Sequence, residues 1–302
     1  MRTLPDTVRT RLQALAWCEA RLTEASLSYG HGTDNPADEA FALVAGVVGL
    51  PENAGWEELE LQGGERSAVA DVLARRVEEA CPLPYLLGEA WFAGLRFACD
   101  RRALVPRSPL AELIVDGFSP WYSGPPPRRI LDLCCGGGAI GISCAVYHPE
   151  ATVTLADIDP DALDLARENV ARHGLQQRMR LCRSDLFSAV RGEVFDIVLC
   201  NPPYVDASDL ERMPAEYRHE PPLGLAAGHD GLLFARRILA GAHEILASHG
   251  LLLLELGNSW EALESAYPTV PFVWVELACG GHGVLAISAG ELREHAAALA
   301  HV

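Results

Sequence analysis

Lysine is absent from this sequence of 302 residues, so arginine supplies every one of the 24 basic side chains. Against them stand 41 acidic residues, which leave a formal net charge of −17. Proteins that bind nucleic acid usually carry a basic face, because contacts between cations and phosphate supply most of their affinity. No Arg-rich block occurs in this sequence, so we expect no stable binding of nucleic acid. An acidic surface would instead attract a basic protein.

Long hydrophobic runs and export signals are also missing. No apolar stretch approaches the roughly 20 residues that a membrane-spanning helix needs, and the N-terminus does not show a basic and then apolar signal pattern. The nine cysteines form no C-x-x-C pair, and the ten histidines lack the spacing of metal ligands, so we expect no metal site. Unpaired thiols are typical of a reducing compartment. We therefore predict a cytoplasmic protein that does not associate with membranes.

The chain divides into three segments by pattern, as its length above the usual single-domain size suggests. Residues 1–84 have helical periodicity, with an amphipathic face that includes Leu12 and Leu15. Residues 85–105, which hold two glycines among several aromatic side chains, predict a β-hairpin connector. Residues 106–302 alternate between strand and helix patterns, which predicts an α/β domain with a mostly parallel sheet.

Four residues, Asn201 to Tyr204 (Asn-Pro-Pro-Tyr), directly follow an apolar run at 195–200 that reads as a buried strand. The two prolines fix φ and hold the preceding residues extended, so the Asn side chain is displayed at the end of the strand. Its side-chain carbonyl can accept one hydrogen bond, and the carbonyl of Pro202 can accept a second. Two acceptors in this position suit the two hydrogens of a planar amide or amino group. A rigid turn is the alternative, and the complete four-residue motif favours the grip.

A glycine loop follows another predicted strand, 129–134. Residues 135–141 read Cys-Gly-Gly-Gly-Ala-Ile-Gly, and successive glycines permit a tight turn and close approach of the backbone to a ligand at the start of a helix. The next predicted strand, 152–156, ends at Asp157. An acid at the tip of the second strand typically holds ribose hydroxyls in such folds. This unit therefore predicts a nucleoside cofactor.

Two cofactors compete for this unit. Gly136, Gly138 and Gly141 satisfy the spacing G-x-G-x-x-G, and Asp157 follows at the distance expected for a dinucleotide. A site for S-adenosylmethionine uses the same loop and the same ribose acid. Such a site also has an acid after the third strand and a polar group that holds the substrate after the fourth. Asp185 and the Asn-Pro-Pro-Tyr motif meet both expectations. The methyl donor S-adenosylmethionine is therefore favoured over a nicotinamide dinucleotide.

With these motifs the chain resembles the glutamine-N5 methyltransferases that modify translation proteins, the HemK/PrmC and PrmB group. The resemblance covers nearly the whole chain and is weakest over the first 80 residues. It is carried by Ile130 to Leu133, the glycine loop, Asp157 to Pro160, Ser184 to Phe187 and Asn201 to Tyr204. In the glycine loop, Cys135 and Gly137 stand where hydroxyl residues are common in the group. This departure affects little, because backbone amides do most of the work in such a loop.

Two further stretches are similar to the PrmB branch, which methylates protein three of the large ribosomal subunit. Residues 85–95 run on to Leu-Val-Pro-Arg-Ser-Pro-Leu-Ala-Glu-Leu at 104–113, where the release-factor branch tends to read Pro-Arg-Pro-Asp-Thr-Glu. Residues 216–225 read Glu-Tyr-Arg-His-Glu-Pro-Pro-Leu-Gly-Leu, with Asp-Gly-Leu at 230–232. The resemblance therefore implies an enzyme that transfers a methyl group from S-adenosylmethionine to the side-chain amide nitrogen (N5) of a glutamine in that basic ribosomal protein.

The resemblance also implies a fold: a seven-stranded Rossmann-like class I methyltransferase sheet, its last strand antiparallel, with a small N-terminal helical domain that selects the substrate. The sequence leaves alternatives open. The same chemistry could act on the GGQ glutamine of peptide release factors, and the Asn-Pro-Pro-Tyr motif also resembles the grip of adenine-N6 DNA methyltransferases, which the acidic charge disfavours. An assembly factor that binds the cofactor without catalysis has no need of the motif. The helices could also be only a packing cap over the site.

The motifs and the resemblance together define a candidate site. The catalytic residues are expected to be Asn201, Pro202 and Tyr204, the tyrosine packing on the flat amide or forming a wall of the pocket. Substrate contacts are expected from Pro203, Arg107 and Glu220, although an arginine after proline is more often a surface or ion-pair residue. Cofactor contacts are expected from Asp132, Cys134, Gly136, Gly138, Asp157, Asp185, Leu186 and Asn201. Asp132 either holds the loop or faces the methionine ammonium through water.

Overall fold

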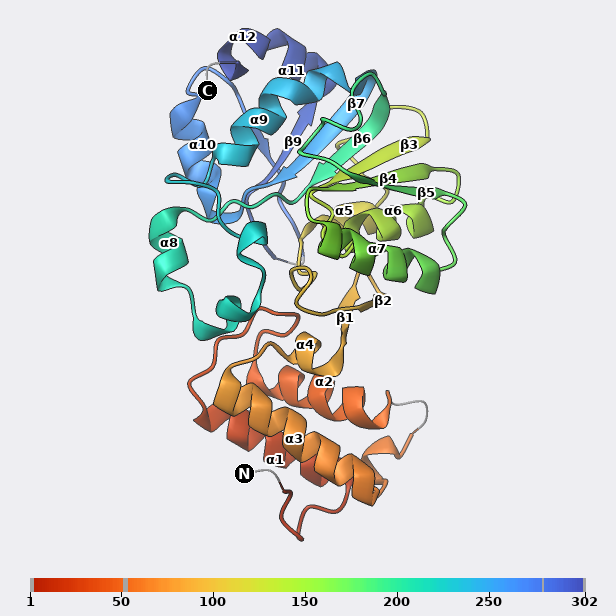
Figure 1. The fold of residues 1–302 in the computed structure, drawn as a ribbon, viewed down its shortest axis with the longest axis vertical. Helices are drawn as coiled ribbons and strands as arrows, with labels where there is room; N and C mark the ends of the chain where they lie inside the picture. Colours follow the sequence, from red (N-terminus) through yellow and green to blue (C-terminus); the bar gives the residue numbers. More distant parts are fainter. Residues whose placement is uncertain (1–2, 51–53, 279, 301–302) are drawn as a thin grey trace.

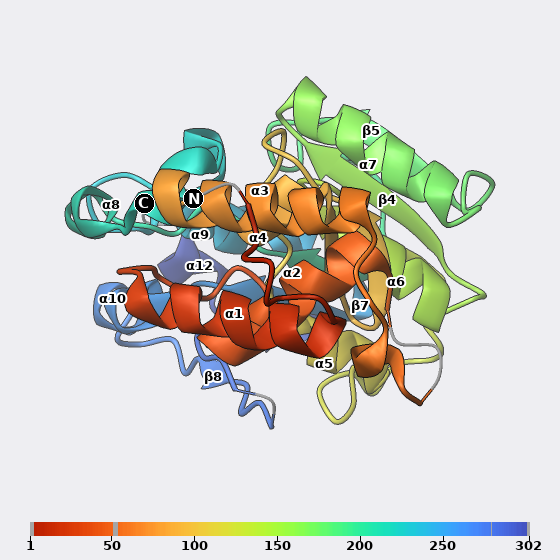
Figure 2. The ribbon, with the colours of Figure 1, turned by 90° about the horizontal axis from the view of Figure 1, so that it is seen from below.

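The computed structural model describes residues 3–50, 54–278 and 280–300. Figure 1 shows a cluster of helices at the N-terminal end, a short hairpin beyond it, and a twisted sheet flanked by helices that contains the rest of the chain. Figure 2 shows the same molecule from the helical end, with the N-terminal helices in front of the sheet.

The N-terminal helices enclose a hydrophobic core of their own. They are α1 (Arg11–Glu24), α2 (Pro36–Val48), α3 (Gly63–Glu79) and α4 (Leu83–Leu87), with the 3-10 helix η1 (Trp56–Glu58) between α2 and α3. Leu22, Leu43 and Leu73 are buried in this core, one from each of the three long helices.

Helix α1 buries only part of the face that was predicted for it, because Leu15 packs against the core of the N-terminal helices whereas Leu12 does not. Leu12 is 51% exposed, whereas Ala14, Cys18 and Leu22 are buried. These three residues recur every four positions, and the two small ones let the backbone of α1 approach its neighbours closely. The prediction named Leu12 and Leu15 but neither Ala14 nor Cys18, which are fully buried in this core.

The hairpin consists of β1 (Glu89–Phe92) and β2 (Leu95–Ala98), which pair antiparallel around a turn at Ala93 and Gly94. It is shorter than the predicted connector, because residues 85–87 belong to α4. Gly88 ends that helix in a left-handed conformation, which glycine adopts without strain.

The rest of the chain forms the predicted seven-stranded sheet, in the order β5-β4-β3-β6-β7-β9-β8. Its strands are β3 (Arg129–Leu133), β4 (Thr152–Asp157), β5 (Met179–Arg183), β6 (Phe195–Cys200), β7 (Leu246–Glu255), β8 (Val273–Trp274) and β9 (Val284–Ser288). Strands β3 to β7 are parallel to one another, and β9 runs antiparallel to both β7 and β8. The prediction of a mostly parallel sheet whose last strand is antiparallel is confirmed.

Helices cover both faces of the sheet. One face carries α5 (Leu110–Val115), α6 (Ala139–Tyr147) and α7 (Pro160–Arg172), and the other carries α9 (Leu233–Gly241), α10 (Trp260–Ala266), α11 (Ala289–Glu294) and α12 (Ala296–Leu299), with the 3-10 helix η4 (Ala242–Glu244) after α9. In β7, Leu251 and Leu253 join the first core, whereas Leu252 and Leu254 join the second. Because side chains alternate along a strand, a strand buried on both faces reads as a continuous apolar run.

The strand order reverses between β3 and β6, because the chain moves outward from β3 to β5 and then returns to the other side of β3. In open α/β sheets a ligand crevice forms at the carboxyl ends of the strands beside such a reversal. The segment after β6 contains α8 (Ala207–Arg212) and the 3-10 helices η2 (Ala215–His219) and η3 (Pro222–Gly224). It extends from this edge toward the N-terminal helices (Figure 1). The 3-10 helix η5 (Gly257–Ser259) follows β7 at the same edge.

Candidate active site

A cavity of about 860 Å³ opens at the carboxyl edge of the sheet. Its wall is built from the glycine loop after β3, the residues after β4 and β5, the Asn-Pro-Pro-Tyr segment after β6 and residues 102–109, which lead from the hairpin to α5. Ser28 and Tyr29, from the loop between α1 and α2, complete the wall on the side of the N-terminal helices. The volume lies within the range of roughly 300–1,000 Å³ that is usual for small-molecule sites.

The glycine loop presents its backbone to this cavity. Cys134 and Gly136 line it, with φ of +59° and +52°. Asp157 at the end of β4 accepts hydrogen bonds from the N–H of Gly136 at 2.8 Å and from the N–H of Asp159 at 2.9 Å. Burial raises the pKa of Asp157, and these backbone hydrogen bonds oppose the rise. Asp157 thus ties the loop to β4 while it lines the cavity.

Asp185 and Leu186 line the cavity beyond the end of β5. The exposed carboxylate of Asp185 accepts two hydrogen bonds of 2.9 Å from Arg237 on α9. Leu186 is buried and has a φ of +46°, so the backbone turns sharply at this point. The hydroxyl of Ser184 donates to the carbonyl of Leu186 and fixes the turn.

Asp132 and Gly138, which were both predicted to contact a cofactor, are not among the residues that line the cavity. Asp132 is fully buried, and one carboxylate oxygen accepts the N–H of Gly141 at 2.7 Å, whereas the other has no hydrogen-bond partner among the described residues. Burial raises the pKa of Asp132 to about 8, and the hydrogen bond from Gly141 opposes the rise. Gly138 caps α6 against the sheet, where a Cβ would come within 3.1 Å of Leu155. Both residues therefore shape the glycine loop from below.

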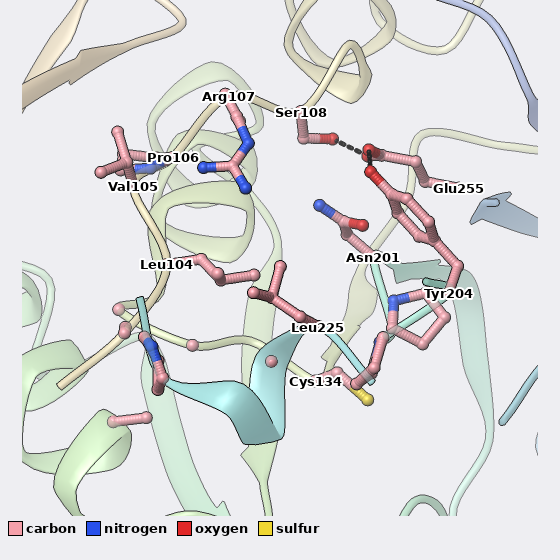
Figure 3. Close-up of a pocket in the computed structure, with 18 of the residues that line it drawn as sticks. Leu104, Val105, Pro106, Arg107, Ser108, Cys134, Asn201, Tyr204, Leu225 and Glu255 are labelled. Carbon is pink, nitrogen blue, oxygen red and sulfur yellow. Dashed lines mark hydrogen bonds between the residues drawn. The ribbon is translucent and has the colours of Figure 1, made fainter. Parts of the chain in front are cut away.

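Asn201 points its side-chain amide into the cavity at the end of β6 (Figure 3). The amide forms no hydrogen bond with any residue that the structure describes, so its oxygen and its NH2 group are both available to a ligand. Pro202 and Pro203 are buried and line the cavity beside it. Tyr204 also lines the cavity, and its hydroxyl donates to Glu255 at 3.3 Å. The motif thus displays one unpaired amide on a rigid segment.

Arg107 and Glu220, both predicted to contact a substrate, pair with each other. Two hydrogen bonds of 2.5 and 2.8 Å join the guanidinium to the carboxylate. The side chain of Glu220 has no exposed surface and does not line the cavity, whereas Arg107 does. Burial alone would raise the pKa of Glu220, but the nearby His31, whose Nε2 lies 3.5 Å from the carboxylate, and the hydrogen bonds from Arg107 outweigh it and lower the pKa to about 2. Glu220 is therefore an anchor for Arg107, and of the two only Arg107 is placed to meet a ligand.

Glu255 and Ser108, neither of which was predicted to act in the site, lie in the same wall. Glu255, the last residue of β7, is buried, and the hydroxyl of Ser108 donates to it at 2.5 Å. Burial raises the pKa of Glu255 to about 7, although hydrogen bonds from Ser108 and Tyr204 oppose the rise. A signal for Glu255 does exist in the sequence, because it is an acid that ends a buried strand, as Asp157 is. The leucine run before it points only to a core strand.

The described residues contain no group of three or more His, Cys, Asp or Glu side chains that could hold a metal ion. Within the same ranges, no helix is both long enough and apolar enough to cross a membrane. The eight described cysteines have free thiols. Burial raises the pKa of Cys99, Cys135 and Cys200, so these thiols stay protonated near neutral pH.

Comparison with known proteins adds the following findings. The family model of the methyltransferase small domain matches residues 116–216. Three curated relatives share the name ribosomal protein uL3 glutamine methyltransferase. The relative from Xanthomonas campestris is 43% identical over 97% of this chain and 95% of its own length. Those from Bordetella pertussis and Francisella tularensis are each 41% identical, the first over 97% of both chains and the second over 92% of this chain and 90% of its own. Among solved structures, a methyltransferase from Pyrococcus furiosus is 18% identical, with a TM-score of 0.44 over 64% of this chain and 88% of that one.

Proposed function

The chain belongs to the ribosomal protein uL3 glutamine methyltransferases, and on this premise we propose that it transfers a methyl group from S-adenosylmethionine to the side-chain amide nitrogen, N5, of a glutamine in ribosomal protein uL3. The observation that carries the proposal is the unpaired amide of Asn201, displayed at the end of a buried strand. The same cavity contains the glycine loop and Asp157, which suit a nucleoside. A donor and an amide acceptor can therefore meet in one cavity.

The cavity fits S-adenosylmethionine in three respects. Gly136 has no side chain, so its backbone lines the cavity directly and would contact the methionine end of the cofactor. Asp157 would hold the ribose hydroxyls, and Asp185 with Leu186 would border the adenine. Beneath the loop, the unpartnered buried oxygen of Asp132 can accept a hydrogen bond from the ammonium through water. When bound, the cofactor supplies an electrophilic methyl group on a sulfonium.

The residues of the Asn-Pro-Pro-Tyr motif contribute to catalysis by orienting the acceptor amide. A carboxamide nitrogen is a poor nucleophile, because its lone pair is delocalised into the carbonyl. Orientation of the reactants can lower the activation free energy by roughly 7–11 kcal/mol in favourable systems. The side-chain oxygen of Asn201 and the carbonyl of Pro202 accept the two amide hydrogens and aim the nitrogen at the methyl group. As the new bond forms, these hydrogens become more acidic, so both contacts strengthen in the transition state. The proton leaves after transfer, so no general base is needed beforehand.

Recognition of the protein substrate is assigned to the N-terminal helices. Residues 1–84 form a recognition domain, residues 85–105 a connector and residues 106–302 the methyltransferase domain. Support comes from Ser28 and Tyr29, which carry the helical part to the cavity wall. The net charge of −17 favours a basic ribosomal protein and disfavours nucleic acid. Because ribosomal proteins are made in the cytoplasm, we place the reaction there.

Peptide mass spectrometry tests the reaction and the substrate together. The enzyme is incubated with S-adenosylmethionine and two unmodified proteins, uL3 and a class-one peptide release factor, both made in cells that lack such enzymes. We expect one methyl group on a glutamine side chain of uL3 and none on the GGQ glutamine of the release factor.

The other outcomes separate the alternatives. A methyl group on the release factor alone would keep the chemistry and overturn the substrate. No methyl group on either protein, with the cofactor still bound, would contradict the proposal as a whole. Filter binding with DNA and RNA would then test the nucleic-acid alternative.

A further inference from the structure

Glu255 connects two walls of the cavity through hydrogen bonds to two hydroxyl groups (Figure 3). Ser108 donates to one of its carboxylate oxygens at 2.5 Å, and Tyr204 donates to the other at 3.3 Å. Ser108 is itself held, because its oxygen accepts the N–H of Leu110 at the start of α5 at 3.2 Å. The chain of contacts therefore ties Tyr204 to a helix that is remote from it in sequence.

The turn after β7 holds the rest of Tyr204. The hydroxyl of Ser259 donates to the Tyr204 carbonyl at 2.7 Å. A Cβ at Gly257 would lie 2.7 Å from the tyrosine ring, and a Cβ at Gly231 would lie 2.5 Å from the same carbonyl. No side chain fits at either glycine while the tyrosine keeps its place. Tyr204 is thus fixed at its ring, its hydroxyl and its carbonyl.

A carboxylate at this place is unfavourable for stability alone. Glu255 is 5% exposed, and taking a charge out of water is costly unless its contacts compensate. Arg107 is the charged side chain that acts on it, and the two form no hydrogen bond within the part of the chain that the structure describes. A buried acid retained in a cleft is more readily explained by a task in the site than by packing.

We propose that Glu255 is a positioning residue for methyl transfer. Through the hydroxyl of Tyr204 it fixes the plane of the tyrosine ring, and with it the plane in which the acceptor amide packs beside Asn201. This inference rests on the proposed function, and it gives Glu255 neither a contact with the acceptor nor a proton to transfer.

A double-mutant cycle tests the inference on the full chain. Glu255→Gln removes the charge and one of the two acceptor oxygens, and Tyr204→Phe removes the hydroxyl but keeps the ring. Each single variant, saturated with cofactor, should methylate uL3 with a kcat about tenfold below that of wild type. Its KM for uL3 and its affinity for S-adenosylmethionine should stay within about twofold of wild type. Because both changes break the same contact, the double variant should fall no more than about twofold below the weaker single variant.

Glu264→Gln is the matched control, because Glu264 on α10 accepts a hydrogen bond from Trp274 at 2.8 Å and does not line the cavity. It should keep wild-type kcat. Wild-type kcat in Glu255→Gln, or losses that multiply in the double variant, would overturn the inference. If Glu255→Gln does not fold, Ser108→Ala takes its place in the cycle with Tyr204→Phe, with the same expectations. Wild-type enzyme in the same assay separates the two levels, since its failure to methylate uL3 would contradict the proposed function itself.

Discussion

At the scale of single residues, Asn201 allows substrate chemistry to be separated from cofactor binding. Its amide lines the cavity and has no partner among the described residues, so replacing it removes a ligand contact and no structural one. Asn201→Ala should therefore lower methylation of uL3 by at least about 100-fold, while the affinity for S-adenosylmethionine stays within a few fold. Turnover assays combined with calorimetric titration of the cofactor measure both. Retained turnover would rule out the amide grip.

Glu220 leads to a prediction of pH dependence. The pKa of an unperturbed glutamate is 4.5, and the fold lowers that of Glu220 to about 2. The folded state thus favours the carboxylate, so its stabilising contribution is fully present above about pH 4.5 and is lost as the pH falls toward 2. Glu220→Gln should lower the free energy of unfolding by about 3 kcal/mol at pH 7, because Arg107 loses its buried counter-charge. The difference from wild type should shrink below pH 4.5.

Asp164→Asn is the matched control for this prediction. Asp164 pairs with Arg167 on the surface of α7, and the two side chains are 59% and 63% exposed. Exposed pairs contribute about 0–1 kcal/mol, so this variant should unfold nearly as wild type does at every pH. Urea unfolding between pH 3 and pH 7 measures both variants. A difference for Glu220→Gln that does not change with pH would show that its charge is not what stabilises the fold.

The sequence predicts which residues gather at the cavity better than it predicts which of them face a ligand. Gly136, Asp157 and Asn201 each follow a strand, and the carboxyl ends of parallel strands meet at one edge, so a local pattern is sufficient. A local pattern could not show that Arg107 faces the cavity while Glu220 is buried behind it. The two lie 113 positions apart, and no local pattern shows that one is the buried anchor of the other.

At the scale of elements, a buried ion network around Arg76 joins α2, α3 and η2. Arg76 on α3 contacts Glu39 on α2, lies 3.1 Å from Glu216 on η2 and donates to the Ser28 carbonyl at 2.9 Å. The three charged side chains are at most 4% exposed. Because η2 supplies Tyr217 to the cavity wall, the network fixes the N-terminal helices against the wall of the candidate site.

Arg76→Leu should be strongly destabilising, because it leaves two buried carboxylates without a counter-charge. We expect a loss of about 3–5 kcal/mol in the free energy of unfolding. We also expect kcat/KM for uL3 to fall more than the affinity for the cofactor, since η2 loses its hold. Arg75→Leu is the neighbouring control: Arg75 is 40% exposed and pairs with Glu79 at 3.6 Å, so its loss should cost less than about 1 kcal/mol. Equal destabilisation by the two variants would contradict the role of the network.

Sequence patterns predict the kind and order of the helices and strands. They do not predict which side of each element is buried or which ion pairs join one element to another. Short apolar runs that end at a glycine loop, an acid or Asn-Pro predict the strands and their common edge. The inward face of α1 was predicted only in part: Leu15 packs against the core as expected, but Ala14 and Cys18 were missed because they are small and carry little hydrophobic signal. The contact between Arg76 and Glu216 spans 140 positions, so it depends on how the folded elements meet and leaves no trace in either helix alone.

At the scale of the whole molecule, charge is the property that acts over distance. The sequence carries 41 acidic and 24 basic side chains, and the basic ones are all arginines. Many of those arginines pair with acids on the surface, as Arg128 does with Glu150 and Arg167 with Asp164. The unbalanced acids therefore determine the field that an approaching partner meets. Such a field raises the association rate of a cationic protein and repels phosphate.

This field predicts how methylation responds to salt. The Debye length is about 10 Å at 0.1 M ionic strength and shortens as salt is added, so long-range attraction between the enzyme and basic uL3 is screened. We expect kcat/KM for uL3 to fall about tenfold as NaCl rises from about 0.02 to 0.3 M, with kcat nearly unchanged, because steering acts on the encounter. A short neutral peptide around the modified glutamine is the control, and its kcat/KM should vary little. A flat response for uL3, or inhibition by polynucleotide at low salt, would contradict an electrostatic origin of substrate choice.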